Sequence, residues 1–141
     1  YLLGAAAAVV PFLALARRVG RISTAQRFAV GPDATREQAE QTAQLLARAR
    51  THVLLDFLPN FGTLDAYHAL EALPGDRTVV IGGTHDQLTP GKHARRIAAA
   101  VPGARLDVVE GAGHMVMLEH RDVLTRAVLD LVDQVEADAR D

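Results

Sequence analysis

Two side chains that can transfer protons, Asp86 and His114, each follow a short apolar segment. A neutral imidazole takes a proton from a nucleophile with one ring nitrogen, while a carboxylate on the other nitrogen fixes the tautomer and stabilises the imidazolium that forms. Gly82-Gly83 precedes the acid and Gly111-Ala112-Gly113 precedes the histidine. Because glycine permits a tight backbone, these loops could aim both side chains. The residue types therefore predict an acid–base pair, provided that the fold brings them together.

The segments around this pair predict a strand, a helix, a second strand and a second helix. Residues 78–81 form a continuous β-branched and apolar run, typical of a strand that is buried on both faces, and residues 106–109 form a second strand. Between them, Thr89-Pro90 predicts a helix start, with Thr as the N-cap and Pro at the first helical position. The last helix, roughly residues 122–137, has an apolar stripe broad enough to cover a sheet.

A strand–helix–strand crossover makes the two strands parallel, so that their carboxyl ends meet at one edge of the sheet. Asp86 follows the first strand and His114 follows the second, and this edge is where open α/β sheets place their active sites. Alone, Asp86 would fit a turn or an N-cap, and His114 would fit a hydrogen-bonded loop histidine. Their coincidence at two adjacent strand ends favours a functional pair.

Residues 1–76 have a different character, because they predict helices and no convincing strand. Thr35-Arg-Glu-Gln38 is a capping box, in which the Thr hydroxyl accepts from the Gln38 amide while the Gln side chain reaches back. The helix that it opens extends to about Arg50, and further helical pieces cover residues 53–58 and 65–73. We divide the chain into a helical cap and lead-in region, residues 1–76, and an α/β core region, residues 77–141.

Two segments of the core region resemble a known family. Val79-Val-Ile-Gly-Gly-Thr-His-Asp86-Gln-Leu-Thr-Pro90 resembles the segment after strand seven of α/β-hydrolase enzymes, and Val101-Pro-Gly-Ala-Arg-Leu-Asp-Val-Val-Glu-Gly-Ala-Gly-His114-Met-Val-Met-Leu-Glu119 resembles their strand-eight segment. The similarity is close over residues 77–135. This part of the chain most resembles the lipase- and esterase-like members of the family found in actinobacteria. The resemblance implies the C-terminal strands and helices of an α/β-hydrolase parallel sheet, with Asp86 as the triad acid and His114 as the general base.

Two departures from the family pattern accompany this resemblance. The family often has a basic residue and Pro after the position of Glu119, whereas this chain has His120-Arg121, which leaves the start of the last helix open. More important, the nucleophile of this fold stands in a G-x-S-x-G elbow earlier in the chain, and the 141 residues contain no such elbow. Ser23 is the one serine, and we expect it to be a helix cap or turn residue.

These observations predict the C-terminal part of a serine-type hydrolase, which supplies the acid and the histidine but not the nucleophile. The implied partner is the missing N-terminal half of the same fold. An acid–base pair alone has no preorganised donors for a developing oxyanion, so we expect the isolated chain to lack useful esterase activity. The helical first half is rich in apolar residues and would line an apolar pocket. We expect Met115 and Val116 to pack under the site, and a contribution of either to the pocket is the alternative. A small apolar ester or lipid-like substrate is therefore expected.

Composition excludes several other classes of protein. The net charge is −2 and Lys92 is the single lysine, so there is no basic patch for nucleic acid. The apolar run of residues 2–16 contains Pro11 and is too short to span a bilayer, and we expect a cytoplasmic protein without a membrane span. The absence of cysteine excludes thiolate chemistry.

Metal and cofactor sites are not predicted. A zinc site could be drawn from His85, His114, Glu119 and His120, but their spacing does not match that of zinc-binding helices. The run Gly82-Gly83-Thr84 lacks the glycine pattern and the lysine of a phosphate-binding loop.

Two alternatives stay open at the level of the sequence. The same acid and base would serve a dehalogenase or epoxide hydrolase with an aspartate nucleophile, or a perhydrolase with a serine. From a different class, the chain could be a non-catalytic interaction module derived from the fold, because a half sheet exposes an unpaired edge that invites association.

Overall fold

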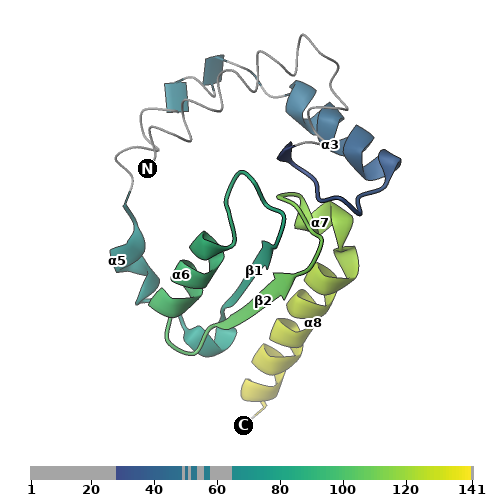
Figure 1. Ribbon diagram of the computed structural model, residues 1–141. Coiled ribbons are helices and arrows are strands. Elements are labelled where there is room, and N and C mark those ends of the chain that lie inside the picture. Colours follow the sequence, from purple (N-terminus) through teal and green to yellow (C-terminus); the bar gives the residue numbers. More distant parts are fainter. Residues whose placement is uncertain (1–27, 49, 51, 54–55, 58–64, 141) are drawn as a thin grey trace.

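The computed structural model describes residues 28–48, 50, 52–53, 56–57 and 65–140 (Figure 1). Its centre is a parallel pair of strands, β1 (Val79–Gly83) and β2 (Arg105–Val109). The register pairs Val79 with Arg105 and Gly83 with Val109. Helix α6 (Lys92–Ala100) makes the connection between the strands. The predicted strand–helix–strand crossover and the α/β fold class are therefore confirmed.

Strand β1 extends past the predicted end at Ile81 and includes Gly82 and Gly83. At Gly82 an added Cβ would lie 2.9 Å from the Ala94 Cβ, so the missing side chain lets α6 approach the strand closely. Only Gly83 of this strand is fully buried, and the four residues before it are half-buried. The prediction of a strand buried on both faces is wrong for the described residues, because two strands and their flanking helices cover too little area.

Helix α6 begins later than predicted, and Thr89 is not its N-cap. Gly91 occupies the N-cap position, and no side chain caps the helix. The Thr89 backbone N–H and hydroxyl instead both donate to the carboxylate of Asp86. A carboxylate is a strong, charge-assisted acceptor, and it draws Thr89 into the loop before the helix.

The chain closes with α7 (Val116–Glu119) and α8 (Arg121–Asp138), so the last helix begins directly after His120. The ion pair between Arg105 and Asp130, with an N–O distance of 2.9 Å, connects α8 to β2. The apolar stripe of α8 was predicted to cover a sheet, yet most of its large side chains are exposed. They are Leu124, Val128, Leu129, Val132 and Val135. Two strands offer this helix too little surface to bury its stripe.

Helix α3 (Arg36–Arg48) has the predicted capping box. The Thr35 N–H donates to Gln38 Oε1 at 2.7 Å, and the Gln38 N–H donates to Thr35 Oγ1 at 3.2 Å. The helix buries Ala39, Thr42 and Ala43. Figure 1 shows α3 beside α7, so a helix of the first half of the chain lies against the segment that follows β2.

The lead-in to β1 consists of α5 (Tyr67–Leu70) and a 3-10 turn, η1 (Gly75–Arg77). Helix α5 is shorter than the helix predicted over residues 65–73. Residues 52–53 and 56–57 are helical, as predicted for this stretch, whereas residues 54–55 and 58 lie outside the described residues. The apolar run of residues 2–16 also lies outside them. No helix in the described part of the chain has the length and apolar character to cross a bilayer, and the cytoplasmic location stays a prediction.

Candidate active site

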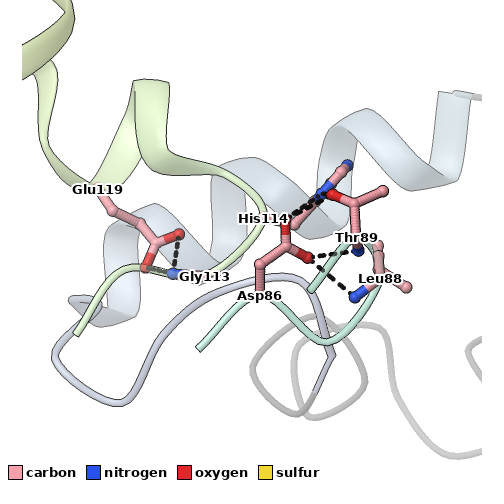
Figure 2. A network of polar contacts seen from close by, with 6 residues as sticks. All are labelled: Asp86, Leu88, Thr89, Gly113, His114 and Glu119. Carbon is pink, nitrogen blue, oxygen red and sulfur yellow. Dashed lines mark hydrogen bonds and ion pairs between the residues drawn. The ribbon is translucent and has the colours of Figure 1, made fainter. Parts of the chain in front are cut away.

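The turn after β1 carries Asp86 and the turn after β2 carries His114, so both residues lie at the same edge of the sheet. Figure 2 shows the two side chains together. The two side chains touch: His114 Nδ1 lies 3.0 Å from Asp86 Oδ2. An ionised carboxylate can only accept, so Nδ1 carries the proton and donates it to Asp86. The predicted contact between acid and histidine is confirmed, while their roles in a reaction stay proposals.

The Asp86 carboxylate is held by four donors. Oδ1 accepts from the backbone N–H groups of Leu88 and Thr89 at 2.9 and 2.8 Å. Oδ2 accepts from the Thr89 hydroxyl at 2.7 Å and from the His114 imidazole. The side chain is only 8% exposed. Both oxygens are therefore committed, and the carboxylate is fixed in one orientation toward His114.

These contacts set opposite pKa shifts in the two partners. Burial raises the pKa of the Asp86 carboxyl, but hydrogen bonds from His114 and Thr89 outweigh it and hold the pKa below its ordinary value. The hydrogen bond to Asp86 raises the pKa of His114 against the opposing effect of burial, and the charges of Asp86 and Glu119 add to the increase. Asp86 therefore stays ionised and favours the imidazolium form of His114.

The second ring nitrogen of His114, Nε2, takes no part in the contact with Asp86. Its side chain is 38% exposed, and no residue in the described part of the chain forms a hydrogen bond with Nε2. With Nδ1–H committed to Asp86, the neutral ring presents a lone pair on Nε2. This is the arrangement that a general base needs.

Three backbone-directed contacts join the two loops that carry the pair. The Thr84 N–H donates to the Val109 carbonyl at 3.0 Å, and the His85 N–H donates to the Ala112 carbonyl at 2.9 Å. The Thr84 hydroxyl accepts from the Gly111 N–H at 3.0 Å. At Gly83 an added Cβ would overlap the Ala112 carbonyl oxygen. Glycine is required there by the close approach of the two loops, which agrees with the general expectation from the sequence.

The other side chains considered from sequence do not form a second site. The His85 ring bonds to the neighbouring Thr84 hydroxyl at 3.1 Å, and no metal-binding cluster is found among the described residues. Met115 and Val116 are half-buried beside His114. Ser23 lies outside the described residues.

Sequence reasoning missed two residues of this site. Thr89 fits the pattern of a helix cap, although it lies three residues after Asp86 and its backbone closes a turn on that carboxylate. This spacing, together with a hydroxyl, is a usable signal. The one role that the sequence suggests for the Glu119 side chain is that of a metal ligand, whereas its carboxylate accepts from the Gly113 N–H at 3.1 Å. No local pattern indicates that contact.

The sequence model described as "Alpha/beta hydrolase family" matches residues 2–127, most of the chain. The chain belongs to the alpha/beta hydrolase family. The resemblance drawn from the segments around Asp86 and His114 is thereby confirmed at the level of the family, while the likeness to actinobacterial members in particular stays a prediction.

Individual relatives of this alpha/beta hydrolase cover parts of the chain. This chain is 36% identical to polyketide synthase ThaQ of Burkholderia thailandensis over 93 residues, which are 62% of this chain. It is 41% identical over 51 residues, 36% of its length, to an uncharacterized protein of Mycobacterium tuberculosis. Among solved structures, a thermophilic esterase from Thermogutta terrifontis superposes with a TM-score of 0.70 and 20% identity over 94% of the chain. At that identity, the likeness shows the fold alone.

The chain spans only part of each of these proteins: 4% of the polyketide synthase, 14% of the mycobacterial protein and 51% of the esterase. The names of these proteins therefore carry no activity or substrate over to this chain.

Proposed function

We propose that this chain supplies the acid and the base of a serine-type hydrolase that acts on carboxylic esters or lipid-like substrates. The observation that carries the proposal is the 3.0 Å contact between His114 Nδ1 and Asp86 Oδ2, which leaves Nε2 without a partner in the described part of the chain. The nucleophile and the oxyanion donors would come from outside these 141 residues, since the sequence contains no G-x-S-x-G elbow.

In the proposed reaction His114 Nε2 takes the proton of the serine hydroxyl while that oxygen attacks the ester carbonyl carbon. Asp86 stabilises the resulting imidazolium through Nδ1–H. The imidazolium then gives its proton to the departing alkoxide, and an acyl-enzyme remains. In the second half, Nε2 takes a proton from water, the hydroxide attacks the acyl carbon, and the returned proton releases serine and the carboxylic acid.

The raised pKa of His114 suits this task. A base that holds its proton more tightly has a larger driving force for taking one from a hydroxyl. The four hydrogen bonds on Asp86 keep the acceptor fixed through both steps, so little reorganisation is needed when the imidazolium forms.

An apolar acyl group is the proposed substrate class. Support comes from the helical first half, where Val53 and Phe57 are 42% and 57% exposed, and from the apolar residues Met115 and Val116 beside His114. A series of p-nitrophenyl esters from acetate to octanoate tests this proposal in the complete protein. We expect kcat/KM to rise with acyl length. A preference for short or charged acyl groups would contradict the proposed substrate class.

A fluorophosphonate probe separates serine from aspartate as the nucleophile, because it phosphonylates an activated serine and leaves a carboxylate unmodified. We expect the complete protein to be labelled on a serine outside the 141 residues, with labelling lost in His114→Ala and retained in the control His85→Ala. Absence of labelling together with turnover of a haloalkane or an epoxide would replace the serine chemistry by the aspartate alternative. Absence of both would favour the non-catalytic module.

A further inference from the structure

The carboxylate of Glu119 joins two segments that are far apart in the sequence. Its Oε2 accepts from the Gly31 N–H at 2.6 Å. The Gly113 N–H lies 3.1 Å from both carboxylate oxygens. Figure 2 shows Glu119 directed at Gly113, in the loop that leads to His114. One side chain therefore holds the residue before His114 against the segment at residue 31.

A second bond ties the residue after His114 to the same segment. The Met115 N–H donates to the Ala29 carbonyl at 3.0 Å, so residues 29–31 run along residues 113–115. The two segments are in close contact, because a Cβ on Gly31 would overlap the Gly111 carbonyl and one on Gly113 would overlap the backbone of Val30. The backbone of His114 is thus fixed on both sides by one segment of the first half of the chain.

The position of Glu119 is itself controlled by helix α3. Gln38 Nε2 donates to the carbonyls of Leu118 and Glu119 at 2.9 and 3.2 Å. The same Gln38 side chain accepts from the Thr35 N–H in the capping box. The start of α3 and the end of α7 are therefore locked together.

We propose that Glu119 is a positioning residue for His114: its carboxylate fixes the backbone that carries the imidazole and makes that backbone depend on residues 29–38. The activity readout of this inference rests on the proposed function, whereas the contacts do not. Residues 29–38 belong to the region predicted as cap and lead-in, so a change in that region would reach the histidine through this carboxylate.

Glu119 affects His114 through its negative charge as well as through its hydrogen bonds to the backbone. Among the described residues, the charged groups that act on the imidazole are Asp86, from the turn after β1, and Glu119, from α7, and both favour the imidazolium. Asp86 does so through a direct hydrogen bond, and Glu119 through charge alone. Removing the charge of Glu119 should therefore lower the pKa of His114.

The test compares Glu119→Gln and Glu119→Asp with the control Glu110→Gln in the complete protein. Glu110 is exposed, lies just after β2 and undergoes the same chemical change. For each variant, the ring titration of His114 is followed by NMR, and kcat and KM are measured with p-nitrophenyl butyrate. The melting temperature shows which variants are folded.

In Glu119→Gln we expect a lower pKa of His114 and a loss of kcat on the order of tenfold to a hundredfold with little change in KM, as for a displaced catalytic group. Glu119→Asp retains the charge but is one methylene shorter, so it cannot reach both Gly31 and Gly113. It should lose rate while its His114 titration stays closer to that of the wild type. Glu110→Gln should match the wild type in both readouts.

A folded Glu119→Gln protein with wild-type kcat and wild-type His114 titration would overturn the inference. If that variant does not fold, Glu119→Asp takes its place, and a wild-type kcat in it would have the same consequence. If the wild type hydrolyses no ester, the proposed function fails, and the backbone contacts decide instead: unchanged amide hydrogen exchange at Gly31 and Gly113 in Glu119→Gln would then overturn the positioning role.

Discussion

Replacing Asp86 by an asparagine should move the proton of the neutral His114 ring from Nδ1 to Nε2. The hydrogen bonds of the site give the reason. Oδ1 of Asp86 accepts from two backbone N–H groups, those of Leu88 and Thr89. An amide NH₂ group cannot face two N–H donors, so the carbonyl oxygen of the substituted side chain must stay there. The NH₂ group of that side chain is then directed at Thr89 Oγ1 and His114 Nδ1, the partners of Oδ2 in the wild type.

A donor facing Nδ1 stabilises the wrong tautomer. In Asp86→Asn the imidazole accepts at Nδ1 and carries its proton on Nε2, where it can no longer take one from a nucleophile. The substitution also removes the charge that stabilises the imidazolium. In a serine protease triad the same change lowers kcat by on the order of 10⁴-fold, which corresponds to about 5 kcal/mol of barrier. Because the Asp86 carboxylate also accepts the Nδ1–H of the histidine, we expect a loss of kcat of that size.

The assay is kcat with p-nitrophenyl butyrate for the complete protein, with Asp76→Asn as the matched control. Asp76 is exposed in the turn before β1, at the opposite end of that strand, and its variant should keep the wild-type rate. The ring nitrogen shifts of His114 in NMR report the tautomer directly. An Asp86→Asn protein within about tenfold of the wild-type kcat, or one with the proton still on Nδ1, would refute the reasoning.

Three further predictions concern pH, packing and helix capping. Since the folded pKa of His114 is raised and that of Asp86 is lowered, kcat/KM should rise with pH through a midpoint above the ordinary value of about 6.5. By linkage, the Asp86–His114 pair stabilises the fold most between about pH 4 and pH 6.5. This stability is lost as the pH rises through the folded pKa of His114, and also as it falls through the folded pKa of Asp86. The melting temperatures of the wild type and of His114→Ala should therefore converge outside this pH window. Gly83→Ala should destabilise the protein by about 1–3 kcal/mol in urea unfolding, because its Cβ overlaps the Ala112 carbonyl, and an unchanged midpoint would contradict the close approach. Thr35→Ala should lower the free energy of unfolding by about 1 kcal/mol, because the Gln38 N–H loses its acceptor. An unchanged free energy of unfolding in calorimetry would contradict a stabilising role of the capping box.

The α/β crossover could be predicted well from the sequence, because each signal is local. The β-branched run at β1 is visible within a few residues, and the capping box of α3 is visible in Thr35 and Gln38 alone. The contact between Asp86 and His114 follows from topology, because parallel strands bring their carboxyl ends to one edge.

What the sequence could not predict depends on contacts between distant segments. Nothing near Glu119 indicates that its carboxylate bonds to Gly31. Thr89 has the sequence signature of a helix cap, yet the Asp86 carboxylate competes for its hydroxyl, and the carboxylate is the stronger acceptor. Sequence patterns overestimate the burial of β1 and α8, because an apolar pattern shows which face could be covered and not how much surface is available to cover it.

The most direct test of the central claim is the hydrolysis of p-nitrophenyl butyrate by the complete protein with His114→Ala, compared with wild type and with His85→Ala. Both histidines lie in the turns at the carboxyl end of the sheet, but only His114 bonds to Asp86. If Asp86 and His114 are the acid and base, His114→Ala should lose kcat by several orders of magnitude while His85→Ala stays near the wild type. A His114→Ala protein that is folded and hydrolyses the ester at the wild-type rate would contradict the account.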